Sequence, residues 1–251
     1  MSATVRLEAP AKLTLTLRVT GVRADGYHLI DAEMVSLALA DHLVIAAADT
    51  TELTIDGPTS SGLDAADNLV TKALDAVGRT ARVALTKRIP HGGGLGGGSA
   101  DAAAVLRWAG LDIDDAADLA LAAGLGADVP FCVRGGRARV QGIGDVLTAL
   151  PVVERTVTVA TPDFGCNTAA VYRAWDDLGG PTADGPNDLE PAALRVEPRL
   201  AAFRDALGDA TGVTPHLAGS GSTWWLDGAH PGPGRIVTHT IPAMAVPSAH
   251  G

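Results

Sequence analysis

The feature that most constrains this chain is a glycine run near its middle. Six of the seven residues from Gly92 to Gly98 are glycine, and Leu95 is the exception. Such a run costs conformational entropy on folding, so a globular chain keeps it where the backbone takes unusual dihedral angles or lies close to a ligand. A strand-like alternation over residues 81–86 precedes the run, and a helical pattern over residues 99–109 follows it. We therefore predict a strand, a glycine loop and a helix in that order.

The start of the predicted helix suits an anion. Ser99 is a favoured N-cap residue, and Asp101 would lie in the first turn. The free N–H groups of such a loop and the positive end of the helix dipole attract negative charge to one place. The first functional hypothesis is therefore that this loop binds phosphate.

Other glycine motifs explain the run less well. A Walker A loop needs a lysine after its last glycine, and here Ser99 follows Gly98 directly. The dinucleotide-binding spacing is matched by Gly92, Gly94 and Gly97, but a loop this rich in glycine matches almost any glycine pattern, and a helix rather than a strand is predicted next. A protein-kinase glycine loop would need companion motifs that the chain lacks. A flexible linker seldom lies between a strand and a capped helix.

Composition excludes several classes of protein. The chain has 251 residues, 47% of them hydrophobic, and a formal net charge of −10. It can form one large domain or two small ones, and its negative charge disfavours nucleic acid and anionic membranes as partners. The two cysteines have neither metal-site nor redox-motif spacing, and we find no signal peptide and no long apolar segment. We expect a soluble cytoplasmic protein, with a domain boundary near residues 151–155.

Periodicity and turn signals predict the remaining elements. Strands are expected at residues 4–19, twice within 33–47 with a break at Ala40-Asp41, and at 53–55, 136–141, 156–160, 224–226 and 235–241. Helices are expected at residues 68–77, 114–123, 169–177 and 198–207.

Four polar residues have both a structural and a functional interpretation. Lys12 and Thr14 share the polar face of the first strand and could line a cleft, although a lysine there can equally be an edge charge that limits aggregation. Asn68 is better explained as a helix cap than as a ligand contact. Asp128, which precedes an apolar Val-Pro-Phe segment, is either an N-cap or a buried, paired carboxylate.

The run Asp25-Gly26-Tyr27-His28 is a turn followed by two rings. Tyr27 and His28 could stack on a base-like ligand and form hydrogen bonds with it. An ordinary hairpin end with a surface tyrosine is the plainer alternative.

Taken in order, five motifs resemble those of the GHMP kinases, and the resemblance extends to about Leu226. The motifs are Pro10-Ala11-Lys12, Asp25-Gly26-Tyr27-His28, residues 90–103, residues 125–130 and Gly219-Ser220-Gly221-Ser222. The first two favour a branch whose acceptor carries a cytidine diphosphate. The resemblance implies an α+β fold of two domains, with a ribosomal protein S5 domain 2-like N-terminal domain at residues 1–155 and a ferredoxin-like C-terminal domain at 156–251.

The resemblance also implies a reaction, in which ATP and Mg²⁺ phosphorylate a tertiary alcohol. Lys12 and Asp128 would be catalytic and meet at the acceptor hydroxyl, and Ser99 would lie near the metal ion. Substrate-binding residues would be Thr14, where asparagine is usual in the family, Tyr27, His28 and Tyr172. ATP-binding residues would be Asn68, Pro90, Gly92, Gly93, Gly94, Leu95, Gly96, Gly97, Gly98 and Ser99.

Two other functions stay open. A GHMP kinase for homoserine, a mevalonate or a sugar would have no base to stack on Tyr27 and Tyr172. A non-catalytic nucleotide-binding relative would not need Lys12, Ser99 and Asp128 together. We expect a small-molecule partner and make no prediction of the oligomeric state.

Overall fold

The computed structural model describes residues 4–244 and has the mixed α+β composition that the sequence predicts. The strands are β1 (Val5–Val22), β2 (His28–Ala47), β3 (Glu52–Asp56), β4 (Ala81–Thr86), β5 (Arg137–Gly142), β6 (Val146–Ala149), β7 (Thr156–Ala160), β8 (His216–Leu217), β9 (Trp224–Asp227) and β10 (Arg235–Ile241). The helices are α1 (Leu69–Ala76), α2 (Gly97–Ala109), α3 (Ala116–Leu125), α4 (Val129–Arg134), α5 (Thr168–Asp177), α6 (Glu190–Val196) and α7 (Arg199–Thr211).

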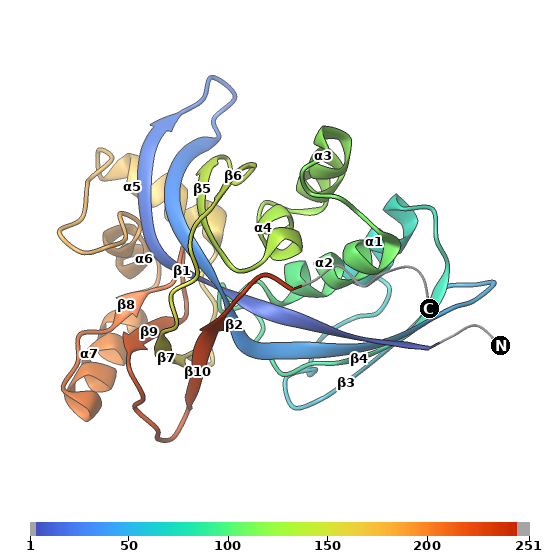
Figure 1. The fold of residues 1–251 in the computed structure, drawn as a ribbon. Coiled ribbons are helices and arrows are strands. Elements are labelled where there is room, and N and C mark those ends of the chain that lie inside the picture. The colour runs from blue at the N-terminus through green and yellow to red at the C-terminus, as the bar shows by residue number, and fades with distance from the viewer. Residues whose placement is uncertain (1–3, 245–251) are drawn as a thin grey trace.

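A long antiparallel hairpin of β1 and β2 runs across the molecule (Figure 1). Strand β1 occupies one edge of β2, and three strands share the other edge. Residues 30–35 of β2 pair with β5, residues 36–37 with β10, and residues 42–47 with β4. Strand β10 also pairs with β7, and β7 pairs with β9. Strand β10 therefore joins the strands of the N-terminal half of the chain to those of the C-terminal half.

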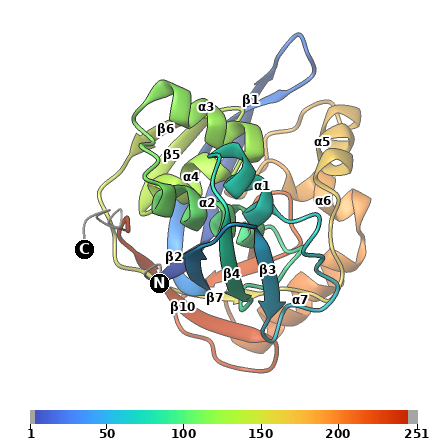
Figure 2. The same cartoon turned by 90° about the vertical axis from the view of Figure 1, so that its right-hand side faces the viewer.

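The helices form two groups around this hairpin (Figure 2). Helix α2 lies centrally in the first group and contacts β1, β2, α1 and α4. Its alanines between Ala100 and Ala104 are buried, and their small side chains let the helix approach the sheet closely. Helices α5, α6 and α7 form the second group. The predicted domain boundary at residues 151–155 falls between β6 and β7 and stays a prediction.

The predicted break in the second strand is wrong. Residues 33–47 belong to a single strand, β2, and Asp41 is fully buried within it. An Ala-Asp pair in a sequence resembles a turn, but here the carboxylate is held by a distant lysine, Lys87, and so does not interrupt the strand.

The predicted N-cap of the central helix is also wrong. Helix α2 begins two residues before Ser99, and its N-cap is Gly96, in the left-handed region at φ 69° and with no side-chain cap. Ser99 and Asp101 therefore lie inside the helix. The prediction missed two short helices, α4 and α6, because each has a proline in its first turn and too few turns to show a period. It also missed β6, a strand of four residues.

No helix within residues 4–244 is long and apolar enough to cross a membrane.

Candidate active site

The glycine loop is held in place by its carbonyl oxygens. The backbone N–H of Lys12, on β1, donates to the carbonyl of Leu95 at 3.0 Å, and that of Thr223 donates to the carbonyl of Gly93 at 3.1 Å. Across residues 4–244, no protein acceptor is found for the N–H groups from Gly92 to Gly98. The loop is thus anchored through its acceptors and keeps its donors free, which is the arrangement that an anion requires.

Two glycines of the loop are required by close approach as well as by conformation. Gly94 has φ +79°, and a Cβ atom there would lie 2.7 Å from the carbonyl oxygen of Gly221. Gly96 has φ +69°, and a Cβ atom there would lie 2.7 Å from Cγ of Lys12. The loop therefore packs directly against Lys12 on one side and against the Gly219–Ser222 loop on the other.

Lys12 and Asp128, 116 positions apart in the sequence, form an ion pair beside this loop. Nζ of Lys12 lies 3.3 Å from Oδ2 of Asp128 and donates to Oγ1 of Thr14, also at 3.3 Å. The lysine side chain is 7% exposed and the aspartate side chain 33%. Asp128 occupies the N-cap position of α4, but its carboxylate accepts no hydrogen bond from the helix backbone. The carboxylate pairs with Lys12 instead. Of the two interpretations of Asp128, a paired carboxylate fits better than a helix N-cap, and the carboxylate is one-third exposed rather than buried.

Two of the three predicted base-binding rings meet in the structure. The ring of His28 lies 4.7 Å from that of Tyr172, and its Nε2 lies 2.8 Å from Oδ1 of Asp176, on the same helix, α5. Burial, followed by the negative charge of Asp128, raises the pKa of Tyr172 to about 12. The hydroxyl of Tyr172 is therefore a neutral hydrogen-bonding group near pH 7.

Tyr27 lies apart from this group. It is 61% exposed near the turn between β1 and β2, and the guanidinium of Arg23 lies 5.8 Å from its ring centroid. Its contact with a substrate stays a prediction, and the plainer alternative of a surface tyrosine at a hairpin end describes its position here.

Asn68 caps α1, as its residue type predicts. Its Oδ1 accepts the N–H of Val70 at 2.9 Å. A role of Asn68 toward ATP is compatible with its remaining amide group and stays a prediction. Pro90 connects the buried Ile89 to the glycine loop. Ser99 lies at the other end of the loop, in the first turn of α2.

A buried ionic cluster behind the loop escaped the sequence analysis. Nζ of Lys87 contacts Oδ2 of Asp41 and lies 2.6 Å from Oδ2 of Asp101. Burial is the main cause that raises the pKa of Asp101 to about 7, with Lys87 opposing the shift. A signal was available, because the chain has only three lysines, and Lys87 lies five positions before Gly92.

Asn187 was also missed, and it holds the second loop. Its Nδ2 donates to the carbonyls of Leu217 at 2.9 Å and Gly219 at 2.7 Å, and its Oδ1 accepts the N–H of Leu189. A Cβ atom on Gly219 would lie 3.7 Å from Oγ1 of Thr14, so this buried amide fixes a loop that reaches the Lys12 site. No sequence motif identifies it.

The described residues contain no group of three or more His, Cys, Asp and Glu that could hold a metal ion. Mg²⁺ often takes one or two oxygen ligands from the protein and the rest from substrate phosphates and water. The hydroxyl of Ser99, at the start of α2, is an oxygen donor of that kind, so the residues present fit a metal ion bound largely through a triphosphate.

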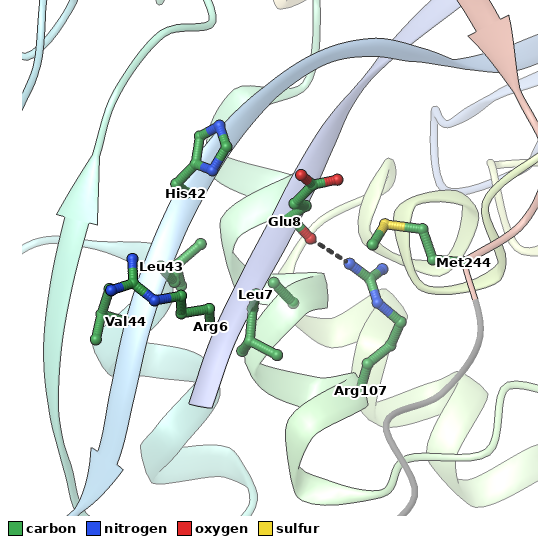
Figure 3. Close-up of a pocket in the computed structure, with 9 residues that line it drawn as sticks. Arg6, Leu7, Glu8, His42, Leu43, Val44, Arg107 and Met244 are labelled. Atoms are coloured by element: carbon green, nitrogen blue, oxygen red, sulfur yellow. Dashed lines mark hydrogen bonds between the residues drawn. The ribbon is translucent and has the colours of Figure 1, made fainter. Parts of the chain in front are cut away.

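A separate pocket of about 410 Å³ lies toward the other end of α2 (Figure 3). Its lining residues are Arg6, Leu7, Glu8, His42, Leu43, Val44, Ala104, Arg107 and Met244. None of them is a predicted site residue. Arg107 is already satisfied there, because it donates to the carbonyls of Glu8 and Cys132.

Known proteins resemble this chain over most of its length. Residues 68–136 match the model of the GHMP kinases N terminal domain. The chain is 39% identical over 248 residues to 4-diphosphocytidyl-2-C-methyl-D-erythritol kinase of Jannaschia sp. (strain CCS1), with 88% of each chain covered. It is 40% identical over 276 aligned positions to the kinase of the same name from Ruegeria pomeroyi, with 97% of each covered.

Solved structures agree with these relatives. A crystal structure of 4-(cytidine 5'-diphospho)-2C-methyl-D-erythritol kinase matches with a TM-score of 0.74 at 31% identity, covering 94% of this chain and 99% of that one. A homoserine kinase from Cytophaga hutchinsonii matches with a TM-score of 0.63 at 19% identity, covering 97% of this chain and 96% of that one, which shows the fold alone. Together they confirm the predicted two-domain α+β fold class.

Proposed function

Because the chain belongs to the 4-diphosphocytidyl-2-C-methyl-D-erythritol kinases of the GHMP kinase superfamily, we propose that its own site carries out their reaction. The γ-phosphate of ATP is transferred to the 2-hydroxyl of 4-diphosphocytidyl-2-C-methyl-D-erythritol, a step of the non-mevalonate route to isoprenoid precursors. The observation that carries this assignment to particular residues is the Lys12–Asp128 ion pair beside a glycine loop with free N–H groups.

The ion pair supports a catalytic role for both residues. Phosphoryl transfer depends on positioning and on neutralising charge rather than on covalent chemistry by the protein. One carboxylate oxygen of Asp128 faces Lys12, which leaves the other for the proton of the acceptor alcohol. Lys12 brings a positive charge to Asp128 and to the place where the phosphoryl group moves. Thr14, which accepts a hydrogen bond from Lys12, orients the ammonium and can also contact the substrate.

The glycine loop and the start of α2 are assigned to the triphosphate of ATP. Free N–H groups and the helix dipole neutralise part of its charge. The hydroxyl of Ser99 and the phosphate oxygens would hold Mg²⁺, which supplies further neutralisation when bound. Asn68 and Pro90 would lie along the nucleotide, as the resemblance implies.

His28 and Tyr172 are assigned to the cytosine ring of the acceptor. Their rings already lie together, and Asp176 fixes the orientation of the imidazole by bonding its Nε2. A cytosine stacked on Tyr172 would lie against the pair of rings that His28 and Tyr172 form. Tyr27 is assigned to the acceptor only by the resemblance, because among the described residues its ring contacts neither His28 nor Tyr172. The proposal also includes a division of the chain into two domains, at residues 1–155 and 156–251, and a cytoplasmic location for the protein.

A magnesium-dependent ATP-consumption assay tests the function. We expect turnover with the cytidyl acceptor and none with homoserine or mevalonate. The variants Lys12→Ala and Asp128→Ala should stay folded and lose turnover by roughly 100-fold or more. Turnover with another acceptor would favour a different GHMP kinase, and ATP binding without turnover on any acceptor would favour a binding protein. Wild-type turnover in either variant would refute the role of that residue.

A further inference from the structure

We propose that Lys87, held between Asp41 and Asp101, is a positioning residue for ATP, and that this cluster fixes both ends of the glycine loop. The inference rests on the proposed function only in taking the loop as the nucleotide site. It adds three residues that do not touch the nucleotide and assigns them an effect on its affinity.

The cluster joins three parts of the fold. Asp41 comes from β2, Lys87 from the segment that follows β4, and Asp101 from α2. The lysine side chain is 4% exposed and the two carboxylates 0% and 2%. Water cannot screen these charges, so each partner depends on the others for its compensation.

Asp41 controls the entry to the loop. Besides Lys87, it accepts the backbone N–H groups of Arg88 and Ile89 through its other oxygen. These are the two residues before Pro90, where the glycine segment begins. A single buried carboxylate thus fixes the direction in which the chain enters the loop.

Asp101 controls the exit from the loop. It lies four residues after Gly97, the first residue of α2, and its Oδ2 is 2.6 Å from Nζ of Lys87. The same ammonium lies 3.3 Å from the position of a Cβ atom on Gly97. The cation therefore sits directly behind the first helical turn, whose N–H groups are free to receive phosphate.

Removing the cation would leave two buried carboxylates facing each other at the two ends of one loop. Without Nζ of Lys87 to bridge them, the two carboxylates would no longer tie Ile89 to α2, and the free N–H groups between them would no longer converge. Since the affinity for a triphosphate depends on that convergence, the loss should appear in ATP binding before it appears in acceptor binding.

Lys87→Met is the first test, and Arg107→Met is its matched control. Arg107 is also a buried cation and lies on α2, but it bonds the carbonyls of Glu8 and Cys132 near the other end of the helix. We expect Lys87→Met to raise the KM for ATP by about tenfold or more, while the KM for the cytidyl acceptor changes by less than about twofold. Arg107→Met should lower the Tm without changing either constant.

Asp101→Asn keeps the proposal testable if Lys87→Met does not fold. The amide preserves the shape and weakens one contact of the lysine, so a smaller rise in the KM for ATP is expected. Titration calorimetry with a non-hydrolysable ATP analogue measures the nucleotide affinity without an acceptor, so the outcome is separate from whether the proposed acceptor is correct. A folded Lys87→Met or Asp101→Asn protein with a lower Tm but wild-type affinity for ATP would overturn the proposal and leave the cluster a purely structural element.

Discussion

Replacing Gly96 by alanine should separate the conformation of the loop from its contact with Lys12. Two effects add. The left-handed backbone at φ +69° costs an alanine about 1–2 kcal/mol. The new Cβ atom would lie 2.7 Å from Cγ of Lys12, and forcing that lysine off its rotamer costs about 0.5–1.5 kcal/mol more. The sum is about 1.5–3.5 kcal/mol of stability, or roughly 3–14 °C in Tm for a chain of this size.

The effect on turnover should exceed the effect on stability. Cγ is close to the backbone, so moving it displaces Nζ from its position 3.3 Å from Asp128. A displacement of about 1 Å at a reacting centre can lower the rate by about 100-fold. We expect a fall of that order in kcat, measured as ADP release at saturating ATP and acceptor.

Gly212→Ala is the control for backbone strain alone. Gly212 ends α7 at φ +70°, almost the same angle, and a Cβ atom added there would meet no other atom within 4 Å. It should lose about 1–2 kcal/mol of stability and keep its turnover. If Gly96→Ala also kept its turnover to within a few-fold, Lys12 would not be the catalytic contact that the loop shapes.

Three further outcomes are expected. Asp176→Ala, which frees the imidazole of His28, should raise the KM for the cytidyl acceptor by about tenfold and leave the KM for ATP unchanged, and steady-state kinetics with equal rises in both would contradict this. Asn187→Leu, which leaves the buried carbonyls of Leu217 and Gly219 without a donor, should cost about 2–4 kcal/mol in urea unfolding, and an unchanged midpoint would show that the second loop is held otherwise. Chelation of divalent cations by EDTA should stop ATP consumption and added Mg²⁺ should restore it, whereas turnover that persists in EDTA would refute the metal requirement.

Local patterns predicted the elements whose signals are local. The strand at residues 81–86 and the cap at Asn68 were correct, because each depends on neighbours within a few positions. The first strand was also correct as a strand, but its predicted alternation of apolar and polar faces was not, since residues 9–15 are all buried and the register shifts between Thr14 and Thr16. The break at Asp41 was wrong because what keeps an aspartate inside a strand is a lysine 46 positions away. Ser99 was a plausible N-cap by residue type, but a glycine in the left-handed region starts the helix earlier.

The sequence was enough to name most residues of the candidate site, but not to derive which of them lie in contact. Spacing cannot show that Lys12 and Asp128 meet, because β1 and α4 are far apart in the sequence and come into contact only when the chain is folded around α2. Resemblance to the GHMP kinases supplied that pairing. It supplied no reason to include Asn187, whose three hydrogen bonds are visible only when the second loop is folded beside it.

The two buried lysines show how geometry separates chemistry from support. Both lie against the same glycine loop, Lys12 beside Gly96 and Lys87 beside Gly97. Lys87 is enclosed by two carboxylates that are almost fully buried, so no substrate atom can reach it and its charge is already compensated. Lys12 has one carboxylate partner, which is one-third exposed and can accept a proton from a bound alcohol. A lysine that must act on a substrate needs such an open partner, and this difference supports the proposals that Lys12 takes part in the reaction and that Lys87 positions the loop.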